Sequence, residues 1–329
     1  MKTKPVRRIS ALEDIPQDLR GCVVAIGNFD GVHRGHQAVL EAALEQARAE
    51  NVPAVALTFE PHPRTVFRPE QPVFRLTPAP LKAKLAGIMG FSAVVELPFT
   101  KEFAQKSAET FIEEVLVGGL GICRVVTGFN FHFGKARQGS PEFLREAGER
   151  LGFAVTVVEP FQDEGAELVS SSRIRACLRE GDVVQAAGLL GYRYTVEAEV
   201  LKGKQLGRTL GFPTANMALP KEADLCTGIY AVRFSRQDGS VHDGVASFGY
   251  RPTVDSDGAP LLETFVFDFD EDLYGETCGV TFFAHLREEK KFNGLDPLVE
   301  QMKRDMAEAK AVLSAVRPLG ELDFALAFG

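Results

Sequence analysis

Two histidines in a glycine-spaced segment are the residues whose types and spacing most directly suggest chemistry. His33 and His36 lie three apart in the string GNFDGVHRGH, residues 27–36, so they can share one face of a helix start. Imidazoles can donate hydrogen bonds to phosphoryl oxygens. The alternative is a purely structural role, in which one histidine caps the helix and the other is exposed. The paired pattern favours phosphate binding. Zinc is a weaker rival because no third ligand is near in sequence.

The histidine segment should connect a strand to a helix. An apolar run, 23–26, precedes it, and apolar residues repeat at helical spacing over 37–50. The segment would therefore lie at the carboxyl end of a strand, where open α/β sheets bind ligands, and at a helix N-terminus suited to phosphate. Three glycines would let the backbone approach a ligand closely: Gly27, Gly31 and Gly35.

Strand and helix patterns alternate over the first half of the chain, which predicts a doubly wound parallel sheet. Further strands are expected at 52–59, 92–97, 124–131 and 154–158. Helices are expected at 81–89 after Thr77, at 108–117 with Gly118-Gly119 as the stop, and at 141–151 between Ser140 and Gly152.

Two segments that follow expected strands could carry chemistry. The string FEPHPR, 59–64, could be a rigid connector or a substrate loop, and the residues alone leave both open. In 128–135, three phenylalanines alternate with polar residues. They could be core, but alternation in a strand would place some on the opposite face, where a planar ring system could stack.

Three consecutive hydroxyls precede an expected helix that runs to about residue 180. Ser170, Ser171 and Ser172 could have the purely structural role of capping the helix. Together with Arg173 and Arg175 they could also form a second anion site, since arginine can clamp a phosphate.

The second half changes to successive strands, which predicts an antiparallel barrel. Strands are expected at 194–201, 228–234, 241–248, 262–269 and 280–286, with a hairpin turn at Asp238-Gly239. Helices are expected at 182–190 and from Asp296-Pro297 to about 312. The latter should turn a core face inward, formed by Met302, Met306, Ala309 and Leu313. The tail, 317–329, carries no usable signal.

The segment 203–216, GKQLGRTLGFPTAN, combines glycines with Lys204 and Arg208. Such loops bring backbone N–H groups and positive charge to phosphate, although the spacing is not that of a Walker A loop. Thr214 and Asn216 would face the same way in an extended segment and could help to hold Mg²⁺. The alternative is a turn-rich loop with a capped end.

Glu263 is a carboxylate in an otherwise apolar strand. From the residues alone, a paired structural charge is favoured over catalysis.

The bulk composition narrows the class of protein. A length of 329 residues suggests two domains. A net charge of −8 argues against a nucleic-acid surface as the main function. Five scattered cysteines indicate reduced thiols in a cytosolic protein. No apolar run approaches the ~20 residues of a membrane span, and the N-terminus does not read as a secretory signal.

Both halves resemble one enzyme family. The string at 27–36 is similar to the H-x-G-H signature of Rossmann-like nucleotidyltransferases and, in full, to bacterial bifunctional riboflavin kinase/FAD synthetases. Residues 207–216, GRTLGFPTAN, resemble a highly specific signature of riboflavin kinases. The resemblance reaches to about residue 312. It implies an N-terminal Rossmann-like nucleotidyltransferase domain with a doubly wound parallel sheet, followed by a C-terminal antiparallel β-barrel of riboflavin kinase type with a terminal helix.

The resemblance also implies a division of labour. Residues 1–186 would be an FMN adenylyltransferase, and residues 187–329 a riboflavin kinase. The substrates would be riboflavin, FMN and ATP with Mg²⁺, the final product FAD, and the place of action the cytoplasm. No nucleic acid or membrane partner is expected.

In the first domain the resemblance assigns His33 and His36 as catalytic residues. Ser172 stands where threonine is usual. Asn130 and Phe133 would contact flavin. The expected ATP and phosphate contacts are Gly27, Phe29, Asp30, Gly31, Gly35, Ser170, Ser171, Ser172 and Arg175.

In the second domain it assigns Glu263 as the general base for the ribityl hydroxyl, and Thr214 and Asn216 as metal ligands. Phe265 occupies a position that is often histidine in the family. The expected ATP contacts are Gly203, Lys204, Gly207 and Arg208.

Two other functions compete with this hypothesis. One is a monofunctional enzyme in which one module only binds flavin. The other is a non-catalytic flavin sensor or nucleic-acid-binding module built on the barrel.

Overall fold

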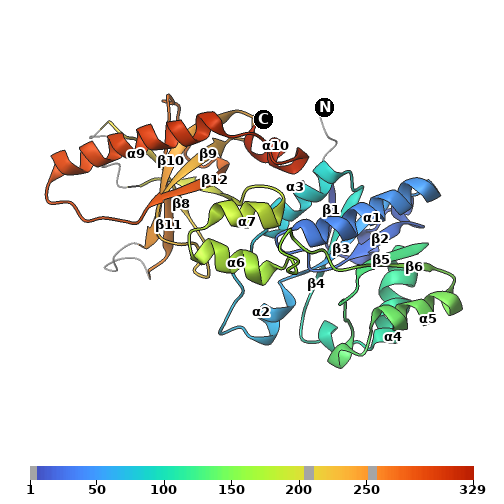
Figure 1. Cartoon of the computed structure of the whole chain (residues 1–329). Coiled ribbons are helices and arrows are strands. Elements are labelled where there is room, and N and C mark those ends of the chain that lie inside the picture. Colours follow the sequence, from blue (N-terminus) through green and yellow to red (C-terminus); the bar gives the residue numbers. More distant parts are fainter. Residues whose placement is uncertain (1–5, 204–210, 251–257) are drawn as a thin grey trace. The chain divides into compact units, whose positions relative to one another are not determined.

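The chain forms two compact units, Met1–Ser170 and Ser171–Gly329. The computed structural model describes residues 6–203, 211–250 and 258–329, and Figure 1 traces them along the sequence. Each unit is described by itself.

A six-stranded parallel sheet forms the centre of the first unit, in the order β1-β4-β3-β2-β5-β6. The prediction of a doubly wound sheet is confirmed. From β2 the chain winds outward through β3 to β4, whereas β5 and β6 lie on the other side, so the winding reverses between β2 and β5. The strands are β1 Arg7–Ile9, β2 Val23–Ile26, β3 Ala54–Glu60, β4 Ala93–Pro98, β5 Arg124–Gly128 and β6 Ala154–Val158.

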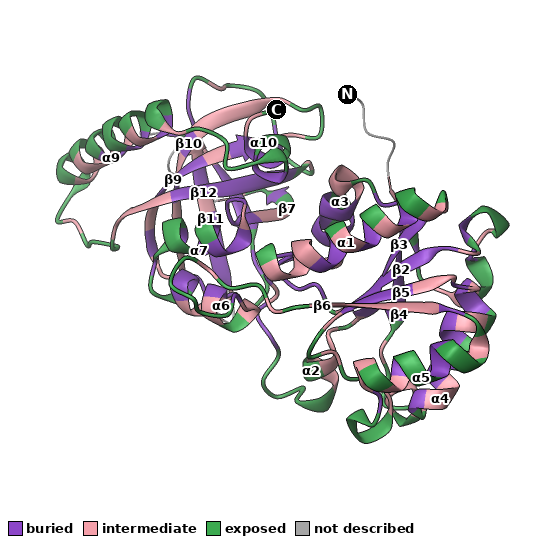
Figure 2. Ribbon diagram, turned by 45° about the vertical axis from the view of Figure 1, so that its right-hand side comes forward, coloured by how far each residue is buried: buried purple, intermediate pink, exposed green. Residues whose placement is uncertain are grey.

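Helices cover both faces of this sheet (Figure 2). Helices α1 and α3 lie on one face, and α4, the π-helical segment that continues it and α5 lie on the other. As predicted, Ser140 caps α5 by accepting the Phe143 N–H, and Gly152 ends it. The bounds are α1 Arg34–Glu50, α2 Pro63–Phe67, α3 Ala79–Met89, α4 Ala108–Thr110, the π-helical segment Phe111–Leu120 and α5 Pro141–Leu151.

Several details of the first unit differ from the sequence predictions. Strand β1 and the short helix α2 were not expected. The helix expected to stop at Gly118-Gly119 continues to Leu120, and the Arg20 guanidinium donates a hydrogen bond to the Gly118 carbonyl. The strand expected over 124–131 ends at Gly128, because the Phe131 N–H turns back to the Gly128 carbonyl at 3.1 Å. The argument from strand alternation beyond Gly128 was therefore wrong.

The second unit begins with two short helices and continues into a closed barrel, in the order β10-β11-β8-β7-β12-β9. Its strand pairs are antiparallel, as predicted. Large side chains fill the interior, among them Tyr230, Phe234, Phe248 and Phe282. The bounds are α6 Ser171–Arg179, α7 Val183–Leu190, β7 Thr195–Leu201, β8 Thr214–Ala218, β9 Gly228–Ser235, β10 Val241–Tyr250, β11 Pro260–Val266 and β12 Thr277–Arg287.

The helix α9, Leu295–Ala315, packs against β9, β10 and β12. Ala309 and Leu313 are buried and Met306 packs beside them, which confirms these three residues of the predicted core face. Met302, the fourth, is half-buried and lies outside this cluster. The helix begins one residue earlier than predicted, after Gly294, so Asp296 lies in its first turn. The strand expected to reach residue 269 ends at Val266.

The tail forms a helix that the sequence did not reveal, α10, Glu321–Ala327. Asp323 is fully buried and accepts the Arg193 backbone N–H at 2.8 Å, and the Arg193 guanidinium also pairs with it. The Phe328 ring lies under the guanidinium groups of Arg193 and Arg233, at 5.6 and 4.2 Å. These contacts fasten the tail to β9 and β12.

Candidate active sites

The loop 27–33 between β2 and α1 has an unusual backbone. Phe29, Gly31 and Val32 have φ values of 47°, 94° and 37°. A positive φ is common for glycine but an outlier for a β-branched residue. Gly27 is required beside them, because a Cβ there would lie 2.9 Å from the Phe29 ring. Strain of this kind persists only where the surrounding structure enforces it, and it concentrates at functional sites.

Asp30 and Thr77 enforce the shape of this loop. Asp30 is buried, and one carboxylate oxygen accepts the backbone N–H groups of Leu76 and Thr77 at 3.0 and 3.1 Å. The Thr77 hydroxyl accepts the Gly31 N–H at 2.8 Å and donates to the Phe29 carbonyl at 3.3 Å. Thr77, expected before the helix α3, therefore serves the loop, and Pro78 precedes α3 instead.

The two histidines form a stacked pair at the start of α1. Their ring centroids are 3.6 Å apart, with planes inclined by 17°. His33 is the N-cap residue of α1, and its Nδ1 accepts the His36 backbone N–H at 3.3 Å. Neutral His33 must therefore carry its proton on Nε2. A Cβ at Gly35 would lie 3.3 Å from the His33 ring, so Gly35 gives the pair room.

His36 is neutral at ordinary pH. Burial lowers its pKa well below the usual value, and the charges of His33 and Lys82 act in the same direction. Its Nδ1 is buried and has no hydrogen-bond partner within the described residues. A buried polar atom without a partner is rare and calls for an explanation. An anion bound at the helix N-terminus would supply one, because its charge favours a protonated imidazole.

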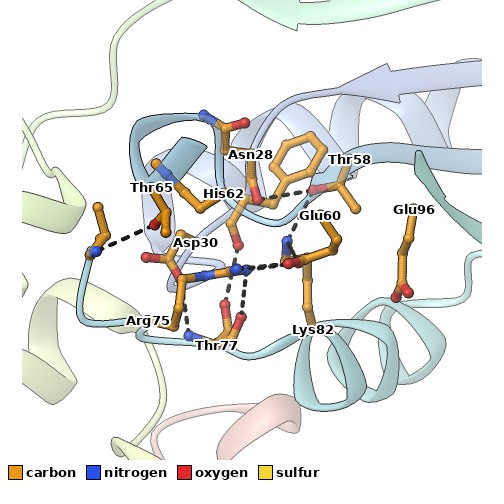
Figure 3. A network of polar contacts seen from close by, with 12 residues as sticks. Asn28, Asp30, Thr58, Glu60, His62, Thr65, Arg75, Thr77, Lys82 and Glu96 are labelled. Atoms are coloured by element: carbon orange, nitrogen blue, oxygen red, sulfur yellow. Dashed lines mark hydrogen bonds and ion pairs between the residues drawn. The ribbon is translucent and has the colours of Figure 1, made fainter. Parts of the chain in front are cut away.

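A network of buried and half-buried charged side chains, formed by Asp30, Glu60, Arg75 and Lys82, supports the loop (Figure 3). Arg75 reaches Glu60 through two hydrogen bonds of 2.7 and 2.8 Å, and Asp30 at 3.4 Å. Lys82 is 3% exposed and donates to Thr58 at 3.0 Å and Glu60 at 3.2 Å.

The network shifts the pKa values of its members. Burial alone would raise the pKa of Glu60, but Arg75 and Lys82 outweigh it and hold that pKa at about 2. Burial lowers the pKa of Lys82, against the opposing effect of Glu60. The segment 59–64, for which a connector and a substrate loop were both open, thus contributes a carboxylate to the support of the histidine loop.

The sequence analysis did not identify Arg75 or Lys82 as part of the site. For Lys82 a signal existed: its helix neighbours three and four residues away include Ala79, Leu85 and Ala86, so it lies on the apolar face of α3. A lysine in that position must be buried with a partner.

The segment after β5 lies at the reversal point of the sheet, beside the histidine loop that follows β2. Asn130 is exposed there, and its carbonyl contacts the Nδ1 of His132 at 2.9 Å. Phe133 is buried and packs with Phe111, Phe131 and Phe143. The ring expected to contact flavin is thus part of an aromatic core cluster.

The serine segment lies at the start of α6. Ser170 ends the first unit, and Ser171 is the first residue of the helix. Ser172 is exposed, and Arg173 and Arg175 are half-buried. These residues belong to a helix start, as both interpretations of the sequence required.

In the barrel, Glu263 lies in a row of paired residues. It is the register partner of Asn216 on β8 and of Ser247 on β10. Thr214 pairs with Phe265 on the same two strands as Asn216 and Glu263. Residues that are paired, or two apart on one strand, face the same side of a sheet. The structure therefore brings the side chains of Thr214, Asn216 and Glu263 together on one face.

That face is the outside of the barrel. The residues on either side of Glu263, Leu262 and Thr264, are fully buried and face the interior, as does Phe248, the partner of Leu262 on β10. Glu263 itself is half-buried. The Asn216 amide N–H donates to the Thr214 carbonyl at 3.1 Å. This contact leaves the amide oxygen of Asn216 and the hydroxyl of Thr214 as neutral oxygen donors, which suit Mg²⁺ when phosphate oxygens complete its shell.

Gly203 packs directly on this site. A Cβ at Gly203 would lie 2.6 Å from the Asn216 amide nitrogen, so the backbone at Gly203 approaches the Asn216 side chain closely. The other residues expected to contact ATP here, Lys204, Gly207 and Arg208, lie outside the described residues. Within those, no group of three or more histidine, cysteine, aspartate or glutamate side chains could hold a metal ion.

Comparison with known proteins gives consistent results for both units. A family model described as FAD synthetase matches residues 15–173, and one described as riboflavin kinase matches residues 190–313. A bifunctional riboflavin kinase/FMN adenylyltransferase of Pseudomonas fluorescens is 40% identical over 304 residues, 92% of this chain and 97% of the relative. A protein of the same name from Escherichia coli K12 is 36% identical over 96% of this chain and 99% of the relative.

A solved structure resembles this chain over most of its length. The match covers 93% of this chain and 99% of the other chain, with a TM-score of 0.81 and 30% identity, and the other protein is described as a macrolide-efflux protein from Streptococcus pneumoniae. In the described part of the present chain, no helix is long and apolar enough to cross a membrane.

Proposed function

The chain belongs to the family of bifunctional riboflavin kinase/FMN adenylyltransferases, and from this premise we propose how its residues divide the two reactions. It transfers the γ-phosphoryl group of ATP to riboflavin, giving FMN, and joins FMN to the AMP part of ATP, giving FAD and pyrophosphate. We assign FMN adenylylation to residues 1–186 and riboflavin phosphorylation to residues 187–329. The two family matches, 15–173 and 190–313, support this division.

For adenylylation, the strained loop with its stacked histidine pair carries the proposal. The attacking FMN phosphate is already anionic, so the protein needs no nucleophile and acts by positioning and electrostatics. His33 donates from Nε2, and His36 gains a proton when the triphosphate of ATP binds. The loop N–H groups at the start of α1 add further donors. The contacts in this loop are Gly27, Phe29, Asp30, Gly31 and Gly35.

We assign further residues to the adenylylation reaction. Ser170, Ser171, Ser172 and Arg175 bind the ATP phosphates, because hydroxyls and a guanidinium at a helix start suit an anion. Asn130 binds flavin. The exposure of Asn130 at the reversal point of the sheet supports this role. Phe133 contributes by packing in the aromatic core cluster with Phe111, Phe131 and Phe143.

For phosphorylation, the row of Glu263, Asn216 and Thr214 carries the proposal. Glu263 accepts the proton of the ribityl 5′-hydroxyl as the oxygen attacks the γ-phosphorus. Thr214 and Asn216 would hold Mg²⁺, which neutralises charge on the phosphates when bound. Gly203 supports Asn216 by close packing. The remaining proposed ATP contacts are Lys204, Gly207 and Arg208.

We also propose that the enzyme acts in the cytoplasm as a small-molecule enzyme without a nucleic-acid partner. All five cysteines are free thiols, as expected in a reducing compartment. The net charge of −8 disfavours a surface that binds the nucleic-acid backbone.

Chromatography of riboflavin, ATP and Mg²⁺ incubated with the purified protein tests both activities at once. We expect FMN to form first and FAD to follow. FMN that accumulates without FAD would identify a monofunctional kinase. Unchanged riboflavin, with added FMN converted to FAD, would identify a monofunctional adenylyltransferase.

A further inference from the structure

An arginine at the start of α1 carries a positive charge that the protein does not neutralise. Arg34 follows His33 directly and is the first residue of the helix. It is exposed, and within the described residues its guanidinium makes no hydrogen bond or ion pair. By contrast, the charge network that supports the loop pairs two carboxylates with two cations, so its charges cancel. His36 is neutral at ordinary pH because burial lowers its pKa. Arg34 therefore adds a cation that neither the network nor His36 supplies.

The ring of Phe161 orients this arginine. The centre of the Arg34 guanidinium lies 6.0 Å from the centroid of the Phe161 ring, within reach of a cation–π attraction. A Cβ at Gly35 would lie 3.7 Å from the Phe161 Cβ, so Phe161 also lies against the next residue of α1. A long side chain loses rotamer freedom when such a contact holds it. The guanidinium is therefore kept beside the histidine pair.

Backbone hydrogen bonds fix the segment 161–169 that carries Phe161. The Val169 N–H donates to the Phe161 carbonyl at 3.2 Å, and the Asp163 N–H donates to the Glu167 carbonyl at 3.0 Å. The Asp163 carboxylate accepts the Glu167 N–H in return, also at 3.0 Å. The chain then continues into Ser170, the first of the three serines. Phe161 thus belongs to a hydrogen-bonded hairpin that leads from the start of α1 to the serine segment.

We propose that Arg34 binds the β- and γ-phosphates of ATP, the part that leaves as pyrophosphate, and that Phe161 is its positioning residue. This rests on the proposed adenylylation at the histidine loop. An oxygen of the FMN phosphate forms a bond to the α-phosphorus, the bond from that phosphorus to the bridging oxygen breaks, and pyrophosphate leaves with the electron pair. Charge on the leaving group grows as the bond breaks, and a guanidinium stabilises it by its charge and by paired hydrogen bonds.

Burial assigns different phosphates to the histidines and to Arg34. His33 is buried, and the Nδ1 of His36 is buried without a partner in the described part of the chain. These groups suit the α-phosphate, because electrostatic stabilisation of the transferred group is strongest where water is excluded. Arg34 lies at the exposed edge of the same helix start. Pyrophosphate has to leave to solvent, so its phosphates lie at this edge, within reach of the flexible guanidinium.

Four variants separate the charge of Arg34, its shape and its position. Arg34→Ala removes the charge. Arg34→Lys keeps the charge but not the planar fork that can bind two phosphate oxygens at once. Phe161→Leu keeps an apolar side chain and removes the aromatic face. Arg48→Ala is the matched control, because Arg48 is an exposed arginine near the other end of α1 whose guanidinium likewise has no ion pair among the described residues.

The test measures the reaction in both directions in the full-length variants: FAD formation from FMN and ATP, and ATP formation from FAD and added pyrophosphate. We expect Arg34→Ala to raise the KM for ATP and for pyrophosphate about tenfold or more, as for lost hydrogen bonds to a charged group. The forward kcat should also fall, since the lost interaction strengthens in the transition state. The KM values for FMN and FAD should stay unchanged.

The other variants grade the effect. Arg34→Lys should raise the same two KM values by less than Arg34→Ala, and Phe161→Leu should raise them about threefold, as for a lost cation–π contact. Arg48→Ala should match the wild type. Riboflavin phosphorylation should be the same in all variants, because Arg34 and Phe161 lie in the other unit.

Three results would overturn the proposal. One is a rise in the KM for FMN in place of the KM for ATP, which would put Arg34 on the attacking phosphate. The second is an unchanged KM for pyrophosphate in Arg34→Ala and Arg34→Lys. The third is an equal effect of Arg48→Ala. The wild type separates the two levels of the argument: if it forms no FAD from FMN and ATP, the proposed adenylylation itself fails.

Discussion

The histidine loop of the first unit and the β8–β11 strand pair of the second both present side chains suited to phosphate chemistry, but different forces hold them. The loop 27–33 has a strained backbone, maintained by Asp30 and Thr77 and supported by a buried charge network. The row of Glu263 and Asn216 needs no strained backbone, since the antiparallel register aligns it.

This difference indicates where each site is vulnerable. The loop depends on side chains that come from distant parts of the sequence, so a substitution in β3 or α3 can disturb it. The barrel site depends on backbone pairing, which side-chain substitutions leave intact. Substitutions should therefore lower its activity mainly at the reactive groups themselves and at the closely packed Gly203. The following predictions test that contrast, in order of decreasing expected effect.

The largest effect is expected at Glu263, which the barrel holds by register. Glu263→Gln should lower the rate of FMN formation about 10²–10⁴-fold, the usual contribution of a positioned proton acceptor. The fold should be kept because the side chain is only half-buried on the outer face. Initial rates with saturating riboflavin and ATP measure this. A loss of less than about fivefold would remove Glu263 as the general base.

The next effect concerns stability and its pH dependence in the charge network. The pKa of Glu60 is lowered in the folded protein from 4.5 to about 2. A lowered folded pKa means stabilisation that is complete above the unfolded pKa and lost as pH falls through the folded one. Glu60→Gln should therefore cost on the order of 2–3 kcal/mol near pH 7.

The difference between Glu60→Gln and the wild type should shrink between about pH 4.5 and 2. Urea unfolding followed by circular dichroism at several pH values measures it. The exposed Glu142, paired with Arg145 on α5, offers a control: Glu142→Gln should change little at any pH. A difference for Glu60→Gln that is constant down to pH 2 would contradict the assigned role of the carboxylate.

A smaller effect is expected at Thr77. Thr77→Val keeps the shape but leaves the buried Gly31 N–H without its partner, which should cost about 1–2 kcal/mol. The loop would relax, and FAD formation from FMN should fall about tenfold, by the same free energy. Thr110→Val is the control, because that hydroxyl is exposed and contacts Ser107. Unaltered FAD formation in Thr77→Val would show that the strained loop shape is dispensable.

The smallest effect is expected at Gly203. Gly203→Ala introduces a methyl group against the buried Asn216 side chain and should displace a proposed metal ligand. We expect a rise of a few-fold in the Mg²⁺ concentration needed for FMN formation, about 1 kcal/mol. Gly239→Ala is no suitable control because Gly239 has a φ of 91°. Gly188→Ala is suitable, since a Cβ there meets open space.

The parts of both sites that depend on local sequence could be predicted. His33 and His36 lie within four residues on a strand–helix connection, and their stacked arrangement follows from helical spacing. Thr214 and Asn216 share a face because they are two apart in a strand.

The parts that depend on long-range pairing could not be predicted. Arg75 and Lys82 reach Glu60 only after α3 has packed on the sheet. The pairing of Glu263 with Asn216 depends on the register of the closed barrel. Likewise the structural role of Asp323 depends on its pairing with Arg193, which is 130 positions earlier in the chain.

Local patterns also misled at two places. The alternation of phenylalanines after Gly128 resembles a strand, but a turn at Phe131 ends it and directs Phe133 into the core. The pair Gly118-Gly119 resembles a helix stop, but the π-helical segment continues through it to Leu120. In both cases tertiary packing outweighed local preference.

The central claim is that two separately supported sites perform the two reactions, and one paired assay tests it most directly. FMN formation from riboflavin and FAD formation from added FMN should both be measured in Glu263→Gln and in Thr77→Val. We predict that Glu263→Gln lowers the first reaction by about 10²-fold or more and spares the second, and that Thr77→Val weakens the second and spares the first. An equal loss of both reactions in either variant would contradict the account.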